Sequence, residues 1–199
     1  MKKNAFVVVA NPGRASLCSA LAKTCASVLV KEGYRTFFHD LYAEKFPPIL
    51  PAGEEGGSAK LPALVGRHCR EIRSADIIVV VHPNWWGQPP AIMKGWIDRV
   101  FRPGVAYRFR EGDGGEGVPE GLLKARAAVV LNTSNTAAGR EADEFGDPLD
   151  AIWRNCVFGL CGVKKVVRKT YGVVVTSTLH RRRGWLKDAE STVRKAVRG

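Results

Sequence analysis

The chain has 199 residues, of which 25% are charged and 45% hydrophobic, and its formal net charge is +12. A chain of this length suits one domain that can bury a substantial core. The early apolar run AFVVVA (5–10) is too short for the core of a signal peptide or for a membrane span. We therefore expect a single cytoplasmic domain over residues 1–199.

The positive charge is concentrated near the C-terminus. Residues 164–199 contain eleven Lys and Arg side chains against Asp188 and Glu190, a net charge of +9. Such a segment attracts polyanions, but basic residues around a terminal helix are usually a solvated face, and no nucleic-acid motif accompanies them. We expect no nucleic-acid partner.

Alternating strand and helix signals follow in chain order. AFVVVA ends at Pro-Gly, as does a strand buried on both faces of a parallel sheet. Apolar residues at helical spacing then run from Ser16 to Lys31, and Gly33 is placed to end that helix. The later expected elements are strands at 36–42, 76–81, 127–134 and within 166–175, and helices at about 62–74, 91–101, 148–161 and 184–198. This alternation predicts a doubly wound α/β sheet with parallel strands.

Ligands of such sheets bind beyond the carboxyl ends of the strands, where the strand order reverses. This rule selects three loops, which are NPGRASLC (11–18), HPNWWGQ (82–88) and NTSNTAAG (132–139). Backbone N–H groups of the first loop are placed to bind a phosphate at a helix N-terminus, although an ordinary helix cap at Ser16 gives the same pattern. The second loop holds two tryptophans on a turn between prolines, where a planar ligand could rest.

Other motifs carry less weight. GDGGEG (112–117) has the letters of a dinucleotide-binding motif, but it follows YRFRE rather than a buried strand and does not open a helix, so we interpret it as a flexible loop. The five cysteines are odd in number without a C-x-x-C pair, so we expect reduced, mostly buried thiols. The four histidines lack metal-ligand spacing, and we single out only His82, which closes a strand beside the expected site.

The stretch HPNWWGQPPAIMKGWIDRVFRPGVAYRF (82–109) resembles the signature of the flavodoxin-like NAD(P)H:quinone oxidoreductases. This group includes DT-diaphorase-type enzymes, general-stress quinone reductases and potassium-efflux ancillary proteins. HDLYAEKFPPIL (39–50) and the helix after NPGRASLC also resemble members, so the resemblance covers most of the chain. It implies a five-stranded sheet in the order 2-1-3-4-5 with helices on both faces, FMN (or FAD) as the cofactor, and NAD(P)H as the co-substrate.

The resemblance also implies which residues hold the flavin. The phosphate would be bound by Asn11, Arg14, Ala15, Ser16, Leu17 and Cys18, the isoalloxazine edge by Pro83, Asn84, Trp85, Trp86 and Gly87, and the pyrimidine side by Asn132, Thr133, Ser134 and Asn135. A flavin needs a flat apolar wall and donors at the edges where charge accumulates on reduction.

The chain departs from the family pattern at three places. Family members often have His where Asn11 stands and Asn where Cys18 stands. Many also have an active-site Tyr and His, whereas no Tyr or His occurs between residues 132 and 170 here. We therefore assign no catalytic side chain.

The implied activity is transfer of two electrons from NAD(P)H to a planar quinone-like acceptor in a ping-pong reaction. The alternative is a flavin-binding electron carrier, or a regulatory or ancillary subunit of a peripheral membrane partner. Carriers are commonly acidic, so a charge of +12 argues against that role. We also expect a homodimer, in which a twofold partner buries Tyr107 and Phe109 from the long connection 102–121 near the rim of the flavin site. A solvated loop folded on its own subunit is the alternative there.

Overall fold

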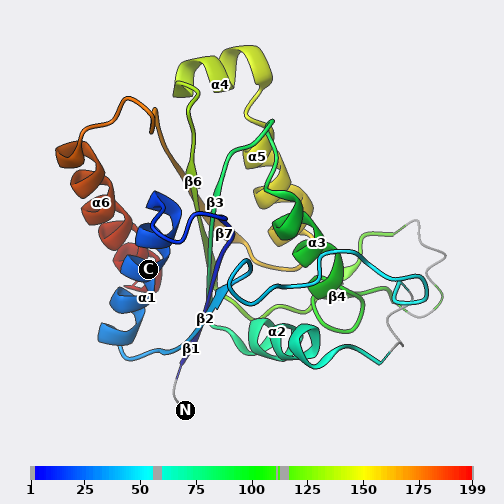
Figure 1. Ribbon diagram of the computed structural model, residues 1–199. Helices are drawn as coiled ribbons and strands as arrows, with labels where there is room; N and C mark the ends of the chain where they lie inside the picture. The colour runs from blue at the N-terminus through cyan, green and yellow to red at the C-terminus, as the bar shows by residue number, and fades with distance from the viewer. Residues whose placement is uncertain (1–2, 56–59, 111, 113–116, 199) are drawn as a thin grey trace.

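A five-stranded parallel sheet forms the centre of the protein, as the computed structural model shows (Figure 1). The structure describes residues 3–55, 60–110, 112 and 117–198. The strands of the sheet lie in the order β2-β1-β3-β6-β7, and each neighbouring pair is parallel. Since β4 and β5 form a separate hairpin, this is the 2-1-3-4-5 order, and the expected fold class is confirmed.

The elements have the following bounds. The sheet contains β1 (Asn4–Val9), β2 (Arg35–Asp40), β3 (Ile77–Pro83), β6 (Ala127–Thr133) and β7 (Lys165–Tyr171). The hairpin pairs β4 (Tyr107–Arg108) with β5 (Glu120–Gly121). The helices are α1 (Leu17–Lys31), α2 (Ala63–Ser74), α3 (Ala91–Val100), α4 (Ala138–Phe145), α5 (Pro148–Ala151), the π-helix η1 (Ile152–Gly159) that continues α5, and α6 (Leu179–Arg198).

Helices cover both faces of the sheet. In Figure 1, α1 and α6 lie on one side, and α2, α3 and α5 lie on the other. Every residue of β3 and β6 is buried, which explains why these strands read as continuous apolar runs. One core packs beneath α1 and α6, with Val79 and Leu21 among its members, and the other contains Val80, Trp96 and Trp153. Among the described residues, none of the helices is both long and apolar enough to cross a bilayer.

Three features differ from the expectations. α4 has no counterpart among the predicted helices, because its sequence AGREADEF buries only Glu141 and so shows no apolar stripe. α6 begins at Leu179 rather than at residue 184, through a polar first turn. The long connection 102–121 contains the hairpin β4–β5. Within GDGGEG, residues 113–116 lie outside the part of the chain that the structure describes.

Candidate active site

The three loops selected from the sequence meet at the carboxyl edge of the sheet, because β1, β3 and β6 are neighbours in it. Thr133 joins all three loops. Its carbonyl oxygen accepts a hydrogen bond of 2.7 Å from the Asn84 N–H, and its hydroxyl lies 3.2 Å from the Cys18 sulfur. The rule that ligands bind beyond the carboxyl ends of the strands therefore selected three loops that are in contact with one another.

The first loop is shaped by its own polar side chains. The Asn11 side chain accepts a hydrogen bond from the Gly13 N–H (2.9 Å), and the Ser16 hydroxyl accepts one from the Ser19 N–H (3.2 Å). Ser16 is thus the N-cap of α1, and its hydroxyl serves the cap. Within the described residues, the N–H groups of Leu17 and Cys18 have no acceptor, so this helix end offers donors to an anion.

Cys18 is buried at the start of α1. Burial raises the pKa of its thiol, and hydrogen bonds with Thr133 and Asn11 only partly offset that rise. A thiol with a raised pKa stays protonated at neutral pH and is a poor nucleophile. Cys18 therefore joins two loops of the site rather than supplying a reactive thiolate.

The second loop is a tight two-residue turn. The N–H of Trp85 donates to the carbonyl of Gln88 (3.1 Å), and the N–H of Gln88 donates back (3.0 Å). The central residues Trp86 and Gly87 have φ values of +57° and +69°. Two successive positive φ angles define a type I′ turn, in which an aromatic residue is strained. Such strain at an exposed turn is typical of a functional site.

This geometry explains why the two tryptophans are not in the core. Trp86 is 100% exposed and Trp85 is 43% exposed, because the turn aims both away from the sheet. Across the segments that the structure describes, the N–H groups of Trp86 and Gly87 find no acceptor. The turn thus presents indole surface and backbone donors together.

A cavity of about 410 Å³ opens beside this turn. It is lined by Asn84, Trp86, Gly87, Thr136, Arg140, Glu141, Phe145 and Pro148. Its volume lies within the roughly 300 to 1,000 Å³ of small-molecule sites. The sequence analysis missed Arg140, Glu141 and Phe145, because they lie on α4 and the sequence of that helix shows no apolar stripe.

Asn84 links the turn to α4. Its side-chain N–H donates to a Glu141 carboxylate oxygen at 2.8 Å. Its side-chain oxygen is buried, and no donor reaches it from the described residues. A buried acceptor without a donor is costly, so this atom beside the cavity indicates a place for a ligand or a water molecule.

The third loop uses most of its side chains to hold its own shape. The Ser134 hydroxyl accepts from the Thr136 N–H (2.9 Å), and the Asn135 side chain accepts from the Val175 N–H (2.9 Å). Asn132 is fully buried; its side-chain oxygen accepts from Arg168, and its NH₂ group contacts the His82 ring. The structure thus places residues 132–135 at the carboxyl edge of the sheet, but they are not among the residues that line the cavity, and the Asn132 side chain points into the interior.

His82 is buried at the end of β3. Burial lowers its pKa to about 4, with a further lowering by the positive charge of Arg168. Its Nε2 atom lies 2.9 Å from the indole N–H of Trp153, which can only donate. The ring proton therefore resides on Nδ1, which donates to the Pro83 carbonyl at 2.7 Å.

A cluster of two histidines and a glutamate lies between β2, α2 and the turn that follows β2. Glu44 accepts hydrogen bonds from His39 and His68, each at 3.0 Å, and these three residues could surround a metal ion. However, the Trp96 indole N–H donates to Nδ1 of His68 (3.0 Å), so the ring proton of His68 lies on Nε2. Because Nε2 faces Glu44 and carries that proton, we interpret the cluster as a buried hydrogen-bond network rather than a metal site.

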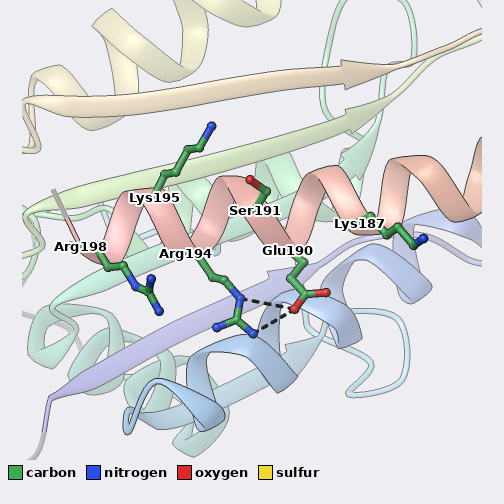
Figure 2. Close-up of a pocket in the computed structure, with 6 residues that line it drawn as sticks. All are labelled: Lys187, Glu190, Ser191, Arg194, Lys195 and Arg198. Atoms are coloured by element: carbon green, nitrogen blue, oxygen red, sulfur yellow. Dashed lines mark hydrogen bonds and ion pairs between the residues drawn. The ribbon is translucent and has the colours of Figure 1, made fainter.

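The basic C-terminal segment forms a hollow on α6, shown in Figure 2. Arg194 forms ion pairs with Glu190 (2.9 Å) and with Glu32 (2.5 Å), the C-cap residue of α1. Figure 2 shows Lys195 pointing to the opposite side of the helix from Arg194. The hollow contains no residue of the three loops, and part of its charge is neutralised by acidic neighbours.

Tyr107 and Phe109 were expected near the rim of the flavin site, where a partner would bury them. Neither residue is among those that line the cavity at the turn. They line a separate apolar groove with Phe101, Val157 and Leu160, among others. This groove and the cavity at the turn share no lining residue.

Comparison with known proteins shows the family to which the chain belongs. Residues 3–183 match the model of a family described as having a flavodoxin-like fold. An uncharacterized NAD(P)H oxidoreductase of Haemophilus influenzae is 32% identical over 174 residues, which are 85% of this chain and 83% of that protein. The chain therefore belongs to the flavodoxin-like family, and the resemblance seen in its sequence is confirmed.

Two further relatives and one solved structure are also similar to this chain. NAD(P)H dehydrogenase (quinone) 1 of Cavia porcellus is 29% identical over 54% of this chain, and the match spans only 46% of that protein. An FMN-dependent NADH:quinone oxidoreductase of Pelagibacter ubique is 26% identical over 74% of this chain and 77% of that protein. The structure of the NAD(P)H:quinone oxidoreductase of Methanothermobacter marburgensis shares the fold, with a TM-score of 0.81 at 23% identity, over 100% of this chain and 99% of that chain.

Proposed function

We propose that the protein is a flavin-dependent NAD(P)H oxidoreductase that binds FMN across the three loops. The observation that carries this proposal is the turn at residues 85–88, which presents two exposed indoles and two N–H groups without acceptors in the described structure. A planar, hydrogen-bonding ring system such as isoalloxazine would satisfy both features. The names of relatives point to the same chemistry.

The start of α1 suits the phosphate of FMN. The donors of Leu17 and Cys18 lie at the positive end of a 15-residue helix, where an anion is favoured. The first turn of this helix contains no acidic side chain that would repel a phosphate. FMN is favoured over FAD because the relative from Pelagibacter ubique is named as FMN-dependent.

The residues around the cavity position and shield the reacting rings. When bound, the flavin would accept a hydride from NAD(P)H and pass two electrons to the acceptor. Trp86 and Phe145 both line the cavity and offer it apolar surface, one from the turn and one from α4. Because one cavity would receive both the nicotinamide and the quinone-like acceptor, we propose that they bind in turn, in a ping-pong reaction.

Among the described residues near the turn, neither the thiol of Cys18 nor the imidazole of His82 is free to act as a proton relay. Cys18 has a raised pKa, and the imidazole of His82 is neutral with both nitrogens engaged. Glu141 is tied to Asn84 and orients it. We therefore propose that this chain contributes binding and orientation, and that protons exchange with solvent.

The apolar groove around Tyr107 and Phe109 supports a homodimer in which this surface meets a second copy of the chain. Phe109 is 46% exposed and Leu160 is 36% exposed in the single chain. Light scattering tests this proposal, since a mass near 21.7 kDa at micromolar concentration with full turnover would contradict the homodimer.

Steady-state oxidation of NADH and NADPH with menadione as the acceptor tests the proposed activity. We expect turnover with at least one nicotinamide. Flavin-loaded protein that turns over neither nicotinamide with several quinones would favour an electron carrier or a regulatory subunit instead.

A further inference from the structure

We propose that Arg168 on β7 is the positioning residue that holds the turn at residues 85–88 in its strained shape. The side chain of Arg168 is only 7% exposed although it belongs to the basic C-terminal segment. Two independent routes lead from its guanidinium to the turn. The inference rests on the proposed function only in taking FMN as the ligand of the turn.

The first route is a chain of polar contacts through β6 and β3. The Arg168 guanidinium donates to the Asn132 side-chain oxygen at 3.0 Å. Because a guanidinium can only donate, this bond fixes the orientation of the amide, whose NH₂ group then lies 3.0 Å from Nε2 and 3.5 Å from Nδ1 of His82. The amide thus contacts the imidazole ring, while the Nε2 lone pair accepts from the Trp153 N–H. His82 in turn donates from Nδ1 to the carbonyl of Pro83, the last residue of β3 and two residues before the turn, at 2.7 Å.

The second route passes through the loop before α5. Arg168 forms an ion pair with Asp147, a residue that has a φ of +46°. The other carboxylate oxygen of Asp147 is buried, and the described residues supply no donor to it, so the ion pair is its main anchor. Pro148 follows directly, and its ring lies against Gly87 in the turn.

The planar geometry of the guanidinium, rather than its charge, explains why residue 168 is an arginine. Arg168 faces Asp147 and also lies 3.4 Å from Asp150, which pairs in turn with Arg154. The local charges therefore compensate one another. The guanidinium donates simultaneously toward Asn132, Asp147 and Thr170, which a lysine ammonium on a flexible stem cannot reproduce in the same planar arrangement.

Hydrogen exchange of the full chain without added flavin tests this inference. In Arg168→Met, we expect the amides of Trp85 and Gln88 to exchange about tenfold faster than in the wild type, as expected when a buried hydrogen-bond network loses one member. Arg168→Lys should give a smaller increase. The matched control is Arg154→Met, because Arg154 binds Asp150 and the Val166 carbonyl but contacts neither Asn132 nor Asp147.

A titration with FMN adds a second readout, and we expect about tenfold weaker binding for Arg168→Met and no change for Arg154→Met. Should Arg168→Met fail to fold, Asp147→Asn removes the ion pair at nearly constant volume and should loosen the same turn. Unchanged exchange at the turn in a folded variant would overturn the inference, as would faster exchange spread evenly over all five strands. Faster exchange at the turn in a protein that binds no flavin at all would support the positioning role and contradict only the proposed function.

Discussion

Pro148 packs directly over Gly87, so that a β-carbon on Gly87 would lie 2.7 Å from Cγ of Pro148. Gly87 also has a φ of +69°, a conformation that glycine adopts without strain. The start of α5 and the turn that carries the tryptophans therefore fit together only when this position has no side chain. The contact couples α4–α5 to the turn, and the cavity lies between them.

Gly87→Ala should distort the turn and weaken FMN binding while the protein still folds. We expect a loss of about 1 to 3 kcal/mol in the free energy of unfolding, measured by urea denaturation. Gly104→Ala is the matched control, because Gly104 has a φ of +77° but nothing lies within 4 Å of its added β-carbon. Equal effects of the two variants on FMN affinity would contradict the proposed role of the turn.

Much of this region could be predicted from the sequence, because the signals were local. The apolar runs of β1, β3 and β6 predicted neighbouring buried strands, and the strand-end rule then selected the three loops that Thr133 joins. The exposed position of Trp86 also followed from its place on a Pro-bounded turn at the carboxyl end of a strand. Whether these loops bind flavin stays a prediction.

The remainder depends on contacts between residues far apart in the chain. Arg168 was counted with the basic surface, yet its side chain is only 7% exposed and binds Asn132 and Asp147. Asn132 was expected to face a ligand, but its amide is held inside by Arg168. α4 was missed because Glu141, its only buried residue, is polar and is held by Asn84. Such pairings leave no periodicity in the sequence.

Replacing both Trp85 and Trp86 by alanine should release flavin and leave the fold intact. Each aromatic contact contributes on the order of 1 kcal/mol beyond buried area, so we expect FMN affinity to fall roughly tenfold or more. The free energy of unfolding should change by less than about 0.5 kcal/mol per site, since both side chains are exposed. Ile49→Ala, at an 82% exposed position outside the cavity lining, controls for loss of apolar surface. Unchanged flavin retention and an unchanged visible spectrum in the double variant would rule out this placement of the ring.

Ser16→Asp should weaken FMN binding by about tenfold through repulsion of the phosphate, and added salt should reduce the difference. Ser16→Asn is the matched control, because asparagine and aspartate both serve well as N-caps and differ in charge. Both variants should keep the stability of the wild type, because each retains an acceptor for the Ser19 N–H. If fluorescence titration gives the two variants equal FMN affinity, the phosphate binds elsewhere.

Glu44→Gln should destabilise the protein at neutral pH. Burial raises the pKa of Glu44, but hydrogen bonds from His39 and His68 outweigh it and lower the pKa to about 2, from an ordinary value of 4.5. A carboxylate with a depressed pKa stabilises the fold above its unfolded-state pKa, and that contribution is lost as the pH falls from about 4.5 toward 2.

We expect Glu44→Gln to cost about 1 to 3 kcal/mol at pH 7, with the difference from the wild type shrinking below pH 4.5. Thermal unfolding across this pH range measures the effect. Glu190→Gln, which breaks an exposed pair with Arg194, should cost less than about 0.5 kcal/mol at any pH. A pH-independent loss in Glu44→Gln would show that the carboxylate charge is not what stabilises the cluster.

The anaerobic half-reactions of the FMN-loaded protein test the central claim most directly. The purified chain is titrated with FMN, mixed with NADH or NADPH in the absence of oxygen, and then mixed with menadione, while the absorbance of oxidised flavin is followed. We predict stoichiometric FMN binding, bleaching by at least one of the two nicotinamides, and full recovery of the absorbance on adding menadione. Failure to bind FMN at micromolar concentration, or bound FMN that neither nicotinamide reduces, would contradict the assignment of this protein as a flavin-dependent NAD(P)H oxidoreductase.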